Sequence, residues 1–373
     1  MKKIIIVLLG GLIVAGIFSC SANPVKQSFA QSRQYSEGKF HNKQDTSVTS
    51  LSSLASTTWR FMFAKPANAT PAQAVPLVSL TPQQLVDDNS QQTAVYRLGH
   101  SSLLLALAGD FWLIDPVFSE RASPFSWAGP KRFHEVPIDP DQLPPLQGVI
   151  ISHDHYDHLD KETIARLAKR AKHFIVPLGV GQYLREWGVN DSQIIELDWW
   201  QDTVVNGVQL TATPAQHFSG RGLGDRNSTL WASWVIKTDT QSLFFSGDSG
   251  YFDGFKEIGE RLGPFDLTMI ENGAYDKDWP DVHMTPEQTL QAHIDLRGRA
   301  LMPVHNGTFD LALHAWYEPF ERITDLAWNA SVNLVTPKIG ERVLVGEPRQ
   351  NSLWWRQMVD EENTELVSAA GVE

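Results

Sequence analysis

The sequence predicts an α/β protein in which two mixed β-sheets are flanked by helices. Short apolar runs form candidate strand pairs between residues 93 and 114, and a second set of paired runs lies between residues 203 and 246. Segments with helical character alternate with further apolar runs in the middle and towards the end of the chain. Strand pairs followed by alternating strands and helices are typical of two sheets packed between layers of helices.

The strands are predicted from short, β-branched apolar runs bounded by turn residues. In the first half they cover residues 94–98, 102–107, 111–114 and 147–151. In the second half, Asn206-Gly207 is a hairpin signal between two short apolar runs. The predicted strands there cover residues 203–205, 208–210, 231–237 and 243–246.

Five helices are predicted between and after these strands. They cover residues 160–171, 179–187, 255–262, 285–296 and 311–328. The fourth begins at Thr285-Pro286-Glu287-Gln288. This tetrapeptide is a capping box with proline in the first turn, a strong signal for a helix N-terminus.

A dense set of metal-binding residue types follows the strand at 147–151. His153, His155, Asp157 and His158 form the pattern His-x-His-x-Asp-His before the next predicted helix. A loop between a strand and a helix lets such side chains converge on one point. Neutral imidazole and carboxylate suit zinc and similar divalent metals, so the pattern predicts a metal site. The alternative is a histidine-rich surface loop that binds nothing.

Further residues of the same types lie in matching contexts. His217, Asp248 and His305 each end an apolar run, and His283 directly precedes the capped helix. Gly247 permits close approach of the backbone before Asp248. A single histidine at a strand end is usually a core or surface residue with satisfied hydrogen bonds. The joint occurrence of these residues with the first motif predicts that they complete its ligand set.

Composition limits the partners of the chain. It has 373 residues, 42% of them hydrophobic, which fits one large globular domain or two small ones. The formal net charge is −12 and the isoelectric point is about 5.4. A protein that binds the phosphate backbone of nucleic acid normally presents a basic face, so no nucleic acid partner is expected.

The N-terminus predicts secretion and lipid anchoring. Lys2 and Lys3 precede an apolar run at residues 4–18, a signal-peptide pattern that is short for a membrane span. The only cysteine, Cys20, ends this run in a context similar to a bacterial lipobox. We therefore expect a signal peptide at 1–20 and a lipidated Cys20, with the protein in the bacterial cell envelope on the periplasmic face of the outer membrane. The alternative is an uncleaved N-terminal anchor.

The remaining chain divides by composition into three parts. Half of residues 21–58 are Ser, Thr, Gln or Asn, which predicts a polar extension and linker over 21–84. Aromatic residues at 38–42 and 58–61 interrupt this polarity and are candidates for packing onto the domain. The metallo-hydrolase domain is predicted at 85–355, and a C-terminal tail at 356–373.

The order of the ligand motifs resembles that of the metallo-β-lactamase superfamily over roughly residues 93–346. The local contexts are similar to the branch of phospholipases D that hydrolyse N-acyl-phosphatidylethanolamine. The resemblance is carried by Arg121-Ala-Ser-Pro124, Gly129-Pro-Lys-Arg132, His153-Asp-His-Tyr-Asp-His-Leu-Asp160, Pro214-Ala-Gln-His217, Asp225-Arg-Asn-Ser-Thr-Leu-Trp231, Ser246-Gly-Asp-Ser-Gly-Tyr251, Asn272-Gly-Ala-Tyr275, His283-Met-Thr-Pro-Glu287 and Val304-His-Asn-Gly-Thr-Phe309. It implies an αββα sandwich with the metal site at one edge of the two sheets.

The resemblance also implies roles for the candidate residues and two zinc ions per chain. One ion would be bound by His153, His155 and His217, and the second by Asp157, His158 and His305. Asp248 would bridge both ions. Asp157 is a further candidate for orienting the attacking hydroxide. Three roles stay open for His283: orienting the product or substrate phosphate, fixing a ligand tautomer, or only filling space beside the start of the helix.

The implied activity is zinc-dependent phosphodiester hydrolysis by a metal-bound hydroxide. N-acyl-phosphatidylethanolamine-type lipids would yield phosphatidic acid and N-acylethanolamine, and a homodimer is expected by resemblance. Arg132, Arg221 and Arg226 are candidate anion contacts, with surface salt bridges as the alternative. Two other functions stay open: a lactonase or other metallo-hydrolase using the same dinuclear site, and a non-catalytic envelope lipoprotein.

Overall fold

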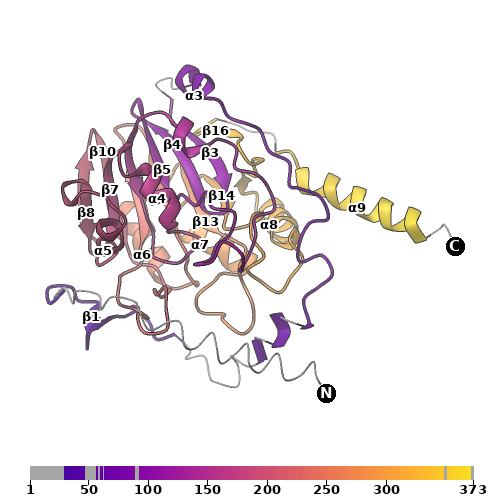
Figure 1. The fold of residues 1–373 in the computed structure, drawn as a ribbon, viewed down its shortest axis with the longest axis horizontal. Helices are drawn as coiled ribbons and strands as arrows, with labels where there is room; N and C mark the ends of the chain where they lie inside the picture. Colours follow the sequence, from indigo (N-terminus) through magenta and orange to yellow (C-terminus); the bar gives the residue numbers. More distant parts are fainter. Residues whose placement is uncertain are drawn as a thin grey trace.

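Two seven-stranded sheets pack face to face, and helices cover the outer face of each (Figure 1). This computed structural model describes residues 29–46, 56–57, 59–61, 63–88, 92–347 and 351–370. The predicted signal peptide and Cys20 lie outside the described residues. Among the helices described, none is long and apolar enough to cross a membrane. The predicted class, two mixed sheets flanked by helices, is confirmed.

The strands of the first sheet pair antiparallel in one half of the sheet and parallel in the other half. In spatial order it contains β16 (Arg342–Leu344), β3 (Ala94–Gly99), β4 (Ser102–Leu107), β5 (Asp110–Ile114), β6 (Leu146–Ile150), β7 (Ala171–Pro177) and β8 (Ile194–Leu197). Strands β16 to β5 pair antiparallel, and β5 to β8 pair parallel.

The second sheet repeats this arrangement. In spatial order it contains β15 (Asn333–Leu334), β14 (Ala300–Val304), β13 (Leu267–Glu271), β12 (Ser242–Phe245), β11 (Ser233–Lys237), β10 (Val208–Thr213) and β9 (Asp202–Val205). Strands β9 to β12 pair antiparallel, and β12 to β15 pair parallel. Asn206 and Gly207 form the predicted β9–β10 hairpin turn, both with positive φ.

Five helices supply the outer layers. On the first sheet lie α4 (Lys161–Leu167) and α5 (Gly181–Glu186); on the second lie α6 (Gly254–Leu262), α7 (Pro286–Asp295) and α8 (Glu318–Asn329). The capping box predicted at the start of α7 is present, with the Thr285 side chain accepting a hydrogen bond from the backbone N–H of Gln288. Short elements elsewhere are α3 (Pro82–Asp88), η1 (Pro140–Gln142) and η2 (Asp191–Gln193).

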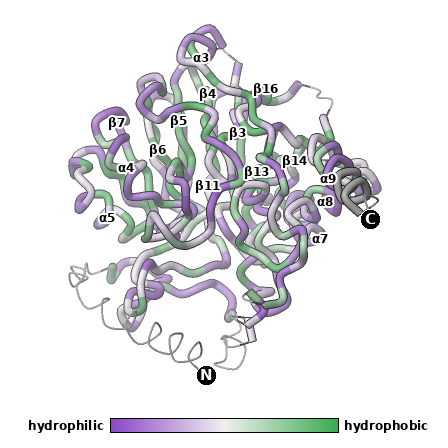
Figure 2. Tube along the Cα trace, turned by 45° about the vertical axis from the view of Figure 1, so that its right-hand side comes forward, coloured by the Kyte–Doolittle hydropathy of each residue, from purple (hydrophilic) through white to green (hydrophobic). Residues whose placement is uncertain are grey.

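Alternation along the strands divides their side chains between two cores. On β4, Leu103 and Leu105 pack between the sheets, whereas Leu104 and Ala106 face the outer helices. Because successive side chains point to opposite faces, a strand covered on both faces must be apolar at every position. Figure 2 shows the resulting concentration of hydrophobic residues in the central strands and of hydrophilic residues in the outer loops.

Two predicted helices were wrong at their ends. The helix predicted over 160–171 ends at Leu167, because Ala171 already begins β7, which pairs with β6. The helix predicted over 311–328 begins only at Glu318, where Pro319 occupies its first turn. In both cases the helical pattern extended into a segment whose backbone is engaged elsewhere in the fold.

The segments predicted as an extension and a tail also contribute packed structure. Strands β1 (Tyr35–Ser36) and β2 (Lys39–Phe40) form a hairpin, and the Phe40 side chain is fully buried. At the other end, α9 (Trp354–Ala370) begins at the edge of the domain and projects away from it (Figure 1). Trp354 and Trp355, at the end of the predicted domain, pack against Phe320 of α8, and Met358 of the predicted tail is buried in the same cluster.

Trp355 should hold α9 on the domain. Its ring stacks on Phe320 with centroids 5.0 Å apart, and its indole N–H donates to Glu321 at 2.6 Å. Trp355→Ala should lower the free energy of unfolding by about 3–5 kcal/mol, because it leaves a large buried void. Gln357→Ala, at an exposed position of the same helix, is the matched control. Urea unfolding monitored by circular dichroism would measure both; equal stability of the two variants would contradict the packing role.

Candidate metal centre

The predicted ligands meet at one edge of the two sheets. Strands β6, β10, β12 and β14 each end at this edge, and the polar residues follow directly in the loops. The carboxyl ends of strands that run the same way lie at the same edge of a sheet, which is where α/β proteins gather their functional side chains. All seven predicted ligands come together here: His153, His155, Asp157, His158, His217, Asp248 and His305.

The first group consists of His153, His155 and His217 around Asp248. His155 Nδ1 lies 2.9 Å from His153 Nε2 and 3.2 Å from His217 Nε2. Asp248 Oδ2 is 3.7 Å from Nε2 of both His153 and His217. A tetrahedral zinc site with bonds of about 2.0–2.1 Å places neighbouring ligand atoms about 3.3–3.4 Å apart. The observed spacing therefore fits a small divalent ion.

The second group consists of Asp157, His158 and His305, again with Asp248. His305 Nε2 lies 3.1 Å from Asp248 Oδ2 and 3.2 Å from Asp157 Oδ2, and His158 Nε2 lies 3.1 Å from Asp248 Oδ1. These close contacts do not have the geometry of hydrogen bonds. Within the described residues, His158 Nε2, His305 Nε2 and Asp248 Oδ1 are buried and make no hydrogen bond. Buried polar atoms are rarely left unpaired, so this group also fits a metal ion. Metal binding by both groups stays a prediction.

His100, which was not among the predicted ligands, joins the second group. Its Nε2 lies 3.0 Å from Asp157 Oδ2, and its backbone N–H donates to Thr308 Oγ1 at 2.6 Å. The His305 N–H in turn donates to the His100 carbonyl at 3.2 Å. Both histidines have positive φ, a conformation that costs energy in residues other than glycine. These contacts hold that strained backbone where the two side chains meet Asp157.

The ligand imidazoles are oriented by hydrogen bonds on their far nitrogens. His158 Nδ1 lies 2.7 Å from Asp115 Oδ2, and His217 Nδ1 donates to the Val282 carbonyl at 3.0 Å. Asp115 also accepts from the Ser152 backbone N–H at 2.7 Å and is fully buried. Such partners fix the tautomer and direct the other nitrogen at the metal. Asp115 was missed by the sequence analysis, although it directly follows a predicted strand as Asp248 does.

His283 lies beside both groups and is tied to a buried glutamate. Its Nδ1 is 3.1 Å from Glu271 Oε2, and a nitrogen of His283 lies within 4.8 Å of ligand atoms of Asp248 and His305. Glu271 ends β13 and was also missed. The side chains of His283 and Asp157 are 14% and 16% exposed, whereas those of the other predicted ligands Asp248 and His305 are at most 2% exposed. His155 is partly exposed as well, so the centre opens to solvent on the side of His155, Asp157 and His283.

The electrostatics of the two groups differ. Burial lowers the pKa of all three imidazoles of the first group, so they are neutral and able to bind metal. Burial also opposes the charged form of His158 and His305, but Asp248 and Asp157 outweigh it. These carboxylates hold the pKa of His158 well above its usual range and raise the pKa of His305 to about 10. A cation bound by the second group would displace these protons, so its affinity should fall as the pH falls.

Among the described residues, no carboxylate forms a salt bridge with Arg132, Arg221 or Arg226, the alternative role of these three candidates. Arg221 Nη1 donates to the carbonyls of Asp154 and Leu159 at 2.6 and 2.7 Å and thereby closes the loop that carries four of the predicted ligands. Arg132 donates to the backbone carbonyls of Val117 and Ser119, which lie in the segment after β5. The Arg226 guanidinium lies over the Phe218 ring, 4.5 Å from its centroid, beside His217. Arg226 is thus the candidate best placed to meet an anionic substrate.

The comparisons with known proteins define the class. Residues 112–306 match the β-lactamase superfamily domain, and they include all seven predicted ligands and just over half of the chain. The chain therefore belongs to this superfamily of metal-dependent hydrolases. A solved metallo hydrolase from the archaeon Ignicoccus hospitalis shares the fold at 20% identity, with a TM-score of 0.52 over 68% of this chain and 97% of that one.

Relatives found by sequence similarity share more identity with this chain than that solved structure does. An uncharacterized protein of Mycobacterium tuberculosis is 42% identical over 87% of this chain and 88% of its own length. The N-acyl-phosphatidylethanolamine-hydrolyzing phospholipase D 1 of Caenorhabditis elegans is 36% identical over 64% of this chain and 72% of its own length. Outer membrane protein RomA of Klebsiella pneumoniae is 56% identical, over 26% of this chain and 76% of its own length.

Asp115 should set the metal affinity of the second group. In Asp115→Asn, the side-chain oxygen can still accept from the Ser152 backbone N–H, so the amide NH₂ group then faces His158 Nδ1. Because that NH₂ group is a donor, the imidazole proton moves from Nδ1 to Nε2. Loss of such a partner typically lowers metal affinity 10–100-fold. Zinc titration against a chromophoric chelator would measure this loss. Asp139→Asn, which changes an exposed carboxylate paired with Arg166, is the control; equal affinities would refute the role of Asp115.

Proposed function

We propose that this protein is a zinc-dependent phosphodiesterase with two zinc ions per chain. Its substrates would be N-acyl-phosphatidylethanolamine-type lipids, and its products phosphatidic acid and N-acylethanolamine. The observation that carries the proposal is Asp248, whose two carboxylate oxygens face His158 and His305 of one ligand group and His153 and His217 of the other. A carboxylate shared between two imidazole groups is suited to bridging two ions.

The substrate class is supported by the phospholipase D relative from Caenorhabditis elegans, which aligns over 72% of its length. Two ions at such a centre supply Lewis acidity and lower the pKa of a shared water. The water oxygen would bond to phosphorus, while the bond from phosphorus to the N-acylethanolamine oxygen breaks and that oxygen takes a proton. Asp157 lies at the open side, with Oδ2 held by His100, where it can orient the attacking water.

His283 has a separate place in this proposal. It lies on the open side of the centre, and Glu271 engages its Nδ1. Its remaining nitrogen is therefore the one left to meet the substrate phosphate. This arrangement supports the role of a phosphate-orienting residue. His283 does not orient the nearest predicted ligand, because His217 Nδ1 donates to the Val282 carbonyl.

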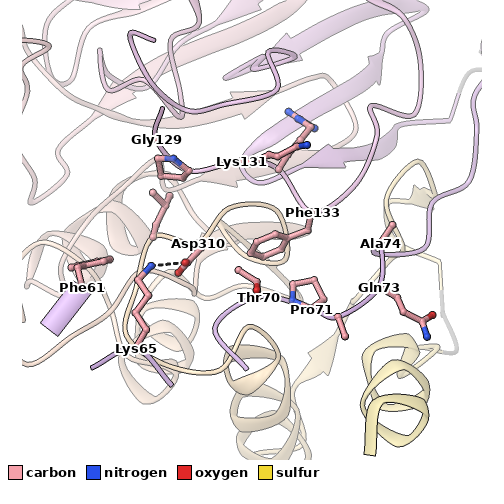
Figure 3. A pocket seen from close by; sticks show the side chains of 14 residues that line it. Phe61, Lys65, Thr70, Pro71, Gln73, Ala74, Gly129, Lys131, Phe133 and Asp310 are labelled. Atoms are coloured by element: carbon pink, nitrogen blue, oxygen red, sulfur yellow. Dashed lines mark hydrogen bonds and ion pairs between the residues drawn. The ribbon is translucent and has the colours of Figure 1, made fainter. Parts of the chain in front are cut away.

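An open pocket next to the centre supports an amphiphilic substrate (Figure 3). Its volume is about 720 Å³, and its walls combine aromatic rings, prolines and three cationic side chains, those of Lys65, Lys131 and Arg132. They include Phe61, Lys65, Pro71, Pro130, Lys131 and Phe133. A smaller pocket of about 20 Å³ shares Phe133, Asp310 and Leu311 with it and reaches His305. The large pocket and His305 thus border the same small space, which holds about one water molecule.

The envelope location belongs to the same proposal. The signal-peptide pattern at residues 1–20 and the lipobox-like context of Cys20 support a lipid anchor on a membrane surface. The outer membrane protein RomA, a relative over part of the chain, supports this location. An enzyme anchored there would meet its lipid substrate in the same membrane. The homodimer stays a prediction.

The reaction is tested with the full-length, zinc-loaded protein in detergent. N-acyl-phosphatidylethanolamine in mixed micelles should yield phosphatidic acid and N-acylethanolamine, identified by mass spectrometry. Asp248→Asn should abolish this turnover and lower the zinc content, because it removes the charge shared by both groups. Near-normal activity of Asp248→Asn would refute the two-metal reaction. A protein that holds two zinc ions but leaves the lipid intact would refute the substrate, and a lactone would then be tested on the same site.

Cys20 is tested by a pair of variants in bacterial cells. The unchanged protein should label with palmitate and sediment with outer membranes. Cys20→Ser should lose the label, since serine offers no thiol to the lipid-transferring enzymes. Ser19→Ala keeps a small residue before the cysteine and should behave like the unchanged protein. Membrane sedimentation of all three without any label would instead establish the uncleaved anchor.

A further inference from the structure

A segment of the polar N-terminal extension reaches the metal centre. Asn42 Nδ2 donates to the His217 carbonyl at 2.7 Å, and the His217 backbone N–H donates to Asn42 Oδ1 at 3.1 Å. The same Oδ1 accepts from the indole N–H of Trp231 at 3.0 Å. One asparagine amide thus pairs with both polar groups of the backbone that carries a predicted ligand.

We propose that Asn42 is a positioning residue for the metal centre, which it completes by fixing the backbone of His217. The inference rests on the proposed function in that it requires His217 to bind metal. It changes the role of the extension: residues 29–46 would be a part of the functional site and not only a connection to the anchor.

The backbone at His217 depends on this pairing because no sheet partner replaces it. Strand β10 ends at Thr213, four residues before His217, so His217 lies in an irregular loop. Its side chain is 1% exposed, so water cannot satisfy its backbone groups instead. The imidazole itself is oriented by its hydrogen bond to the Val282 carbonyl. Within the part of the chain that the structure describes, Asn42 therefore supplies both hydrogen bonds of the His217 backbone.

Asn42 is itself held at a defined position by contacts on both sides of it. Before it, Phe40 is fully buried, and its backbone N–H donates to the Asn227 carbonyl at 2.8 Å. The Phe40 ring packs with those of Phe29 and Tyr35, with centroids 5.1 and 4.9 Å away. After it, Lys43 forms an ion pair with Glu257 of α6. The segment is thus docked as a unit, which allows a single amide to be placed accurately.

A structural role alone would predict a different result from a positioning role. If Asn42 only tied down the extension, its loss would lower thermal stability and leave the ligand geometry intact. If it positions His217, its loss weakens binding of the ion held by His153, His155 and His217, while the ion held by the second group is affected less. The distribution of metal between the two groups therefore separates the two roles.

The test uses the full-length protein in detergent and zinc titration against a chelator. Asn42→Ala should weaken one of two zinc ions 10–100-fold, the range typical of lost partners of metal ligands. Asn42→Asp keeps the acceptor for the His217 N–H but loses the donor to its carbonyl, and it should fall between Asn42→Ala and the unchanged protein. Lys43→Ala removes only an exposed ion pair of the same segment, which contributes little to its docking while Phe40 stays buried, so this variant should bind both ions normally.

Cobalt substitution gives a second readout of the coordination geometry. The visible absorption of one cobalt ion should change in Asn42→Ala and stay unchanged in Lys43→Ala. Unchanged zinc affinities and cobalt spectra in folded Asn42→Ala would overturn the inference. If Asn42→Ala does not fold, the same comparison is made with Asn42→Asp, and wild-type affinities there would overturn it. A protein that binds two zinc ions without cleaving the lipid would refute only the substrate, because the zinc series requires no turnover.

Discussion

The buried carboxylate of Asp248 is the interaction on which the site depends, because it is where the two halves of the molecule meet. It follows β12 of the second sheet, yet it faces histidines from the loop after β6 of the first. Gly247 permits this approach: it has a φ of +56°, and a Cβ at that position would lie 2.7 Å from the Cβ of Ser152. A larger residue would push the two sheet edges apart and separate the ligand groups.

Gathering so many ionisable groups in a buried place has a cost that the surrounding structure must offset. Unpaired charges are strongly disfavoured in the protein interior, and here two carboxylates face five imidazoles with little access to solvent. An outer layer of hydrogen bonds from Asp115, Glu271 and Val282 holds the cluster together. The same layer decides which imidazole nitrogen faces inwards, so it serves stability and metal binding at once.

Much of the fold and of the ligand set could be predicted from the chain, and the exceptions have physical reasons. The β-strand pattern and the capping box at Thr285 are local signals, and both matched the structure. The ends of α4 and α8 were wrong because pairing and turns formed with distant segments override a helical pattern. Asp115 and Glu271 were missed because a single acidic residue at a strand end looks the same whether it faces solvent or a histidine.

The sequence by itself determined the chemistry of the site: the spacing of His153, His155, Asp157 and His158 places these side chains on one loop, whatever the rest of the chain does. Only the tertiary structure decided what surrounds that loop. The pairing of Asn42 with His217 joins residues 175 positions apart, within a segment whose composition indicates a linker. Such pairings leave no trace in local periodicity, because they depend on how the two sheets close against each other and on which segment is docked at their shared edge.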